Sequence, residues 1–63
     1  MEKLTPKAAR LLRKKTQQEC ADALKIHIST YRRLELAPSN FTVEQAEKLC
    51  EFLDVEFNDV YFD

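Results

Sequence analysis

The residues with the clearest capacity for chemistry lie in segment 28–35. Arg32 and Arg33 each carry a planar guanidinium group, which can donate two hydrogen bonds to the O6 and N7 atoms of a guanine. In a helix these arginines lie one turn after Ile28 and Ser29, so the four side chains share one outward stripe. A stripe of this composition can enter the major groove of DNA and contact base edges.

Each of these assignments has an alternative. Arg32 and Arg33 could contact phosphates or only solvent instead of bases. Ile28 could pack on a thymine methyl group, or it could be partly buried at a corner between two helices. The type and spacing of the residues do not separate these possibilities.

Catalytic and metal chemistry find little support in the chain. Cys20 and Cys50 are the only cysteines and His27 is the only histidine, which is too few for a usual zinc site or a disulfide framework. Both cysteines are interpreted as small buried apolar residues. Because no nucleophile–base pair or phosphate-binding glycine loop occurs either, we expect no enzyme, no cofactor, no metal and no small-molecule ligand.

Charge is divided unevenly along the 63 residues. Residues 1–40 carry a net charge of +5 and residues 41–63 a net charge of −6, although the whole chain sums to only −1. This division predicts one face that can meet a polyanion and another that repels it. Since no apolar run is long enough to span a membrane, a soluble cytoplasmic protein is expected.

The helix-start signals predict an all-α fold. Thr5 precedes a proline at a first helical position, and capping boxes occur at 16–19 and 42–45. Pro38 opens a loop, and a short final turn is expected near 57–61. The apolar residues that we expect to face the core are Ala8, Ala9, Leu11, Leu12, Cys20, Ala21, Leu24, Ile26, Tyr31, Leu34, Val43, Ala46, Leu49, Cys50, Leu53, Val55, Phe57 and Val60.

Two parts of the chain carry a resemblance to a known family. Residues 17–26 read Gln-x-Glu-x-Ala-x-x-Leu-x-Ile, and residues 29–35 end in Leu-Glu. This pattern resembles the Cro/repressor (XRE-type) helix-turn-helix family of phage and bacterial regulators, and the similarity extends over roughly residues 6–62. It implies a compact, five-helix, lambda-repressor-like domain over residues 1–63, with the helix-turn-helix at about 17–35.

The resemblance also implies roles for individual residues. The glutamine that opens the second helix, Gln17, is expected to bind a DNA phosphate, and an arginine of the first helix, Arg10, is expected to pair with Glu35. The outer face of the third helix would read bases. The remaining residues expected near phosphates are Gln18, Arg13, Ser39 and Asn40.

Three positions depart from the family pattern. Lys25 stands where a turn glycine is usual, so a non-glycine residue must adopt a positive φ or the turn must change shape. Tyr31 replaces a branched aliphatic residue, and its hydroxyl needs a partner or an outlet to the groove. His27 stands at the cap of the third helix, where Ser or Thr would be stronger.

The resemblance implies a DNA-binding transcription regulator, specifically a small repressor of the type found on phages and mobile elements. Its partner would be double-stranded DNA. Apolar residues left exposed near the C-terminus could form a homodimer contact, the candidates being Phe57, Val60, Tyr61 and Phe62. The alternative function is a protein-interaction module of the same fold that binds little or no DNA.

Overall fold

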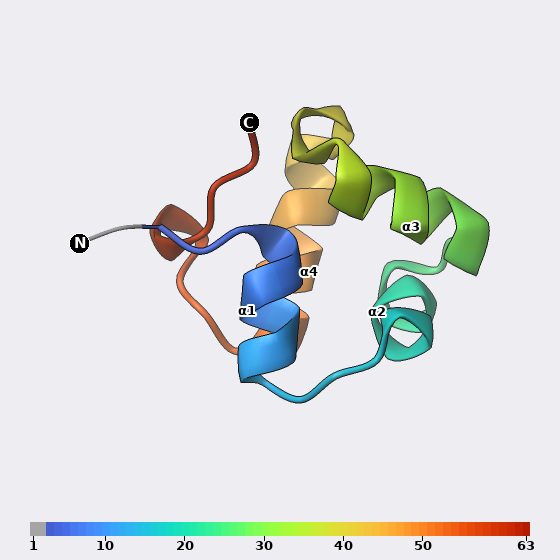
Figure 1. The fold of residues 1–63 in the computed structure, drawn as a ribbon, viewed down its shortest axis with the longest axis horizontal. Coiled ribbons are helices and arrows are strands. Elements are labelled where there is room, and N and C mark those ends of the chain that lie inside the picture. Colours follow the sequence, from blue (N-terminus) through green and yellow to red (C-terminus); the bar gives the residue numbers. More distant parts are fainter. Residues whose placement is uncertain (1–2) are drawn as a thin grey trace.

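The computed structural model describes residues 3–63 as an all-α fold, as expected. Within this range lie four α-helices and two one-turn 3₁₀ helices, at Pro38–Asn40 and Phe57–Asp59. The α-helices are α1 (Pro6–Leu12), α2 (Gln17–Leu24), α3 (Ile28–Leu36) and α4 (Val43–Leu53). Figure 1 shows α2 and α3 on one side of the molecule and the C-terminal 3₁₀ turn on the other, near the N-terminal segment.

The expected count of five helices is corrected to four, because the last turn does not extend. At Val60 the backbone is extended and forms a parallel β-bridge with Leu4. The Leu4 N–H donates to the Asp59 carbonyl at 2.8 Å, and the Tyr61 N–H donates to the Leu4 carbonyl at 2.7 Å. Since these backbone groups are bonded across the fold, they are unavailable for a further turn of helix.

Side-chain caps fix where the helices begin, and the predicted caps are confirmed. The Thr5 hydroxyl accepts the Ala8 N–H at the start of α1. Complete capping boxes open α2, from Thr16 to Glu19, and α4, from Thr42 to Gln45. Each such cap stabilises a helix end by about 1 kcal/mol.

The core forms where α2 packs on α3 and α4. Cys20 and Cys50 are both buried free thiols, and burial raises the pKa of each, which confirms their interpretation as apolar core residues. The buried apolar residues are Ala9, Cys20, Ala21, Leu24, Tyr31, Leu34, Phe41, Ala46, Leu49, Cys50, Leu53 and Val60.

Four expected core positions are corrected. Leu11 and Leu12 are 56% and 62% exposed, because they occupy the last two positions of α1, whose buried residues lie nearer its start. Val43 is exposed at the first position of α4, where the buried face begins only one turn later. Phe57 is also exposed, in the C-terminal 3₁₀ turn.

Candidate nucleic-acid interface

The turn between α2 and α3 sets the direction of α3. Lys25 adopts the left-handed conformation, with φ 57° and ψ 42°, which confirms that a non-glycine residue takes the positive φ here. The turn is closed by hydrogen bonds from Lys25 N–H to the Asp22 carbonyl and from Ile26 N–H to the Ala21 carbonyl. His27 then caps α3, with its Nδ1 atom accepting the Ser29 N–H at 3.3 Å.

The inner side of α3 is fixed by burial, as predicted. Tyr31 is fully buried and Leu34 nearly so, and the Tyr31 ring packs edge-on against Phe41. The outer side carries the residues expected to read bases. Among these, Ser29, Arg32 and Arg33 are exposed, whereas Ile28 is half-buried and packs against the core.

A buried ion pair ties α1 to the last turn of α3. The Arg10 Nε atom donates to Glu35 Oε2 at 2.6 Å, and the two side chains are only 9% and 4% exposed. Arg10 also donates to the Lys15 carbonyl at 3.0 Å, so the guanidinium joins α1, the following loop and α3. The hydrogen bond to Glu35 raises the pKa of Arg10 above its ordinary value.

The pKa of Glu35 is lowered by the same contacts. Burial is the strongest single influence and acts to raise this pKa, but the hydrogen bonds from Arg10 and Gln17 contribute to outweighing it. Glu35 is therefore held as a carboxylate in a mostly buried position.

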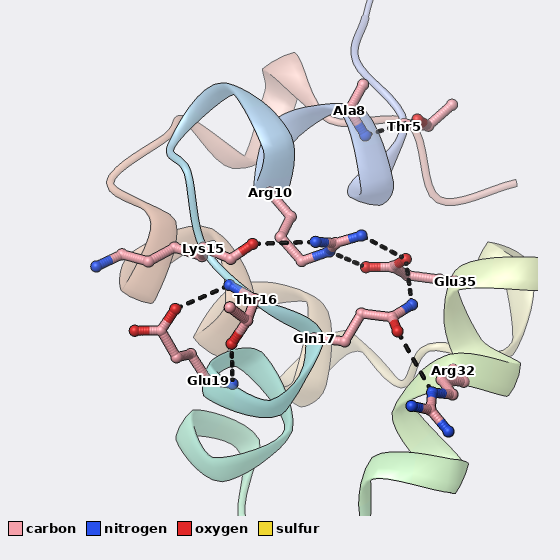
Figure 2. A network of polar contacts seen from close by, with 9 residues as sticks. All are labelled: Thr5, Ala8, Arg10, Lys15, Thr16, Gln17, Glu19, Arg32 and Glu35. Carbon is pink, nitrogen blue, oxygen red and sulfur yellow. Dashed lines mark hydrogen bonds and ion pairs between the residues drawn. The ribbon is translucent and has the colours of Figure 1, made fainter.

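Gln17 extends this network to the outer face of α3. Its Nε2 atom donates to Glu35 Oε1 at 3.1 Å, and its Oε1 atom accepts the Arg32 Nε–H at 3.3 Å. Figure 2 shows the resulting chain of contacts from the Lys15 carbonyl through Arg10, Glu35 and Gln17 to Arg32. The side chain of Gln17 thus lies between a buried carboxylate and an exposed guanidinium.

The Tyr31 hydroxyl is buried next to this network and has no hydrogen-bond partner among residues 3–63. Burial, together with the nearby Glu35 carboxylate, raises the pKa of this phenol well above its usual range. Tyr31, which replaces the branched aliphatic residue usual in the family, therefore places a neutral hydroxyl beneath α3, and this hydroxyl does not reach the DNA-facing side.

The other residues expected near phosphates are dispersed. Gln18 donates to Asp22 on its own helix, and Arg13 donates to the Asp54 carbonyl at the end of α4 at 2.7 Å. Ser39 and Asn40 are exposed in the 3₁₀ turn that follows α3. The structure brings Gln17 close to Arg32 but directs Arg13 towards α4.

The C-terminal apolar residues divide into buried and exposed members. Val60 is buried in the core, where it bridges to Leu4, so it is removed from the candidate dimer contact. Phe57 and Tyr61 are 42% and 50% exposed, and the half-buried Phe62 ring stacks on Phe57 with 5.7 Å between centroids. Three of the four candidates thus retain exposed surface.

Sequence reasoning missed two residues beside the site. A cavity of about 230 Å³ is lined by Lys7 and Leu36 together with Gln17, Arg32 and Glu35. Lys7 lies one turn before Arg10 on α1, and this spacing was the available signal. The cavity has a cationic side chain on α1 and another on α3.

A helix-turn-helix family model matches residues 7–60, which is most of the chain. Neither the comparison with curated proteins nor that with solved structures gave a match. Across residues 3–63, no helix is long and apolar enough to cross a membrane. The match covers α1 to α4 and the turn at Lys25, and the chain therefore belongs to the Cro/repressor (XRE-type) helix-turn-helix family of DNA-binding regulators.

Proposed function

We propose that this protein, acting as one domain over residues 1–63, is a sequence-specific transcriptional repressor that reads the major groove with α3. The observation that carries the proposal is the exposed outer face of α3. Ser29, Arg32 and Arg33 project from a helix whose other side is fixed by the buried Tyr31 and Leu34. Such a face offers hydrogen-bond donors to base edges on a rigid support.

The reading set comprises Ser29, Arg32 and Arg33, with the exposed part of Ile28 against a thymine methyl group. The Arg33 side chain makes no hydrogen bond or ion pair with any other residue in 3–63, so its whole guanidinium is available to a guanine. One bidentate arginine–guanine contact is worth about 1–3 kcal/mol of discrimination.

Phosphate contacts would flank this face. The backbone N–H of Gln17 is at the first position of α2, where helix N–H groups lack partners within the helix and favour an anion. Gln18 lies beside it, and Ser39 and Asn40 would reach the backbone beyond the other end of α3. Arg13 would have to leave the Asp54 carbonyl to contribute.

A homodimer would place two reading helices on one operator. Phe57, Tyr61 and Phe62 supply an exposed aromatic surface, which suits a two-fold contact between identical chains. Half-sites would then lie about one helical turn of DNA apart. Repression would follow from occupation of the operator, and an origin in a phage or mobile element is proposed on the family resemblance alone.

Selection of bound duplexes from a random pool tests the proposal. We expect one enriched motif, a two-fold repeat, and affinity that falls steeply with salt. A reporter with the selected site at its promoter should be repressed when the protein is expressed. If neither selected nor random duplexes bind at low salt, the proposal fails and the protein-interaction alternative takes its place.

A further inference from the structure

We propose that Gln17 is a positioning residue for base reading: its side-chain amide holds Arg32 in a fixed direction, and the buried Arg10–Glu35 pair fixes that amide. The inference rests on the proposed function in assigning Arg32 to bases. It adds a second role to Gln17, which was expected only to bind a DNA phosphate.

The partners of Gln17 determine which way its amide faces. The Glu35 carboxylate can only accept, so the amide nitrogen must face it, at 3.1 Å from Oε1. Arg32 Nε–H can only donate, so the amide oxygen must face α3, at 3.3 Å. Only one of the two amide orientations satisfies both neighbours, and the network therefore aligns the acceptor that Arg32 needs.

The buried end of this network, the Arg10–Glu35 pair, is held in place by further contacts. Glu35 and Arg10 are mostly buried, and Arg10 is held in turn by the Lys15 carbonyl. Figure 2 shows Gln17 reaching from this buried group to Arg32, which lies on the helix opposite α2. Because Glu35 holds the amide nitrogen of Gln17, the amide oxygen of Gln17 is held in place for the exposed Arg32.

The contact suits an arginine that must still bind DNA. It uses only Nε, so the two terminal nitrogen atoms of Arg32 remain available for a base. An exposed arginine has many rotamers, and holding it before binding lowers the entropy lost on contact. Arg33 is the matched comparison, since it is on the same helix and its side chain has no hydrogen-bond or ion-pair partner in the described part of the chain.

Gln17 can hold Arg32 and still lie beside a phosphate. The contacts of the Gln17 amide with Glu35 and Arg32, which we call the relay, use the side-chain oxygen and one N–H of the amide. The backbone N–H of the same residue remains free to approach an anion at the start of α2. The positioning role of the side chain is therefore compatible with a phosphate contact through the backbone.

The first test uses the free protein and needs no DNA. Nitrogen relaxation of the arginine Nε–H groups reports how ordered each guanidinium is, and Arg32→Lys assigns the Arg32 signal by removing it. We expect the Nε–H group of Arg32 to be more ordered than that of Arg33. Gln17→Met should lower the order of Arg32 to the level of Arg33. Gln18→Met, which removes only the contact to Asp22, should leave the Arg32 signal unchanged. Equal order for Arg32 and Arg33 in the unsubstituted protein would overturn the proposal.

The second test measures base preference on the selected duplex and its single-base variants. Gln17→Met should reduce preference roughly two- to tenfold at the base pair that Arg32→Ala also affects, as expected for loss of one hydrogen bond. The effects should be non-additive in the double variant. A uniform loss on every duplex, additive with Arg32→Ala, would show that Gln17 only binds phosphate and would refute the positioning role. If no duplex binds, the proposed function fails, while the Arg32 signal still decides whether the relay exists.

Discussion

Arg10 and Glu35 lie twenty-five positions apart in the chain, yet their side chains meet at 2.6 Å between Nε and Oε2. The pair joins α1 to the last turn of α3, and both side chains are almost fully removed from solvent. Burial of two charges is unfavourable unless each finds further partners. Here the Lys15 carbonyl and the Gln17 amide supply them, so the direction of α3 depends on a complete polar network.

Removal of one member of this pair should be strongly destabilising. Glu35→Ala leaves the Arg10 guanidinium buried without its carboxylate, and we expect a loss of about 3–5 kcal/mol in the free energy of unfolding. Urea denaturation followed by circular dichroism measures the change. The double variant Arg10→Met/Glu35→Leu removes both charges and should lose less than Glu35→Ala. An equal or greater loss in the double variant would contradict this account.

The lowered pKa of Glu35 predicts a specific acid sensitivity. Because the folded-state pKa lies below the unfolded value of about 4.3, the unfolded state binds the proton more readily. The stabilisation is therefore fully present above the unfolded pKa and is lost as the pH falls through the lower folded pKa.

Urea midpoints measured at decreasing pH should show this loss, and Glu35→Gln should flatten the profile below about pH 4.3. Part of the slope should persist in that variant, because the backbone N–H of Thr16 also lowers the pKa of Glu19. Glu44→Gln, which removes an exposed carboxylate on α4, is the control. An unchanged profile in Glu35→Gln would exclude Glu35 as a source of the acid sensitivity.

The left-handed Lys25 predicts a stabilising substitution. A residue with a Cβ atom pays a steric cost at φ 57°, whereas glycine does not. Glycine also loses more backbone entropy on folding, so we expect Lys25→Gly to raise the free energy of unfolding by no more than about 1 kcal/mol. Thermal and urea denaturation would measure it. Ala23→Gly, inside α2, should lower the free energy of unfolding by about 1 kcal/mol. A lower free energy of unfolding in both variants would disprove the steric cost at Lys25.

Much of the fold could be predicted because its signals are local. The capping residues Thr16 and Thr42 act on backbone groups only three positions away, so their sequence spacing suffices. The positive φ of Lys25 was one of two alternatives that the resemblance implied, because a turn glycine is usual at this position, and the structure shows that it is the one adopted. The resemblance placed these signals in one family pattern.

Other features could not be predicted because they depend on contacts between distant segments. Leu11 and Leu12 are apolar, but α1 is short and buries residues nearer its start, an outcome that only the packed neighbours determine. The burial of Val60 was expected, but the pairing of its backbone with Leu4 joins the two ends of the described chain, and neither segment alone indicates it. The link from Gln17 to Arg32 arises only when α2 and α3 cross, since neither residue alone indicates the other.

Substitution of Arg33 separates base reading from general attraction to DNA. Arg33→Ala should relax preference at one position of the selected site and cost about 1–3 kcal/mol on that site, because a bidentate contact to guanine is lost. Arg33→Lys keeps the charge but lacks the planar pair of donors, so it should retain affinity for random DNA and still lose the preference. Lys48→Ala on α4 is the control, and it should change neither quantity. Binding to all single-base variants measured at one salt concentration decides the matter: if Arg33→Ala weakens every duplex equally, Arg33 contacts phosphate and does not read a base.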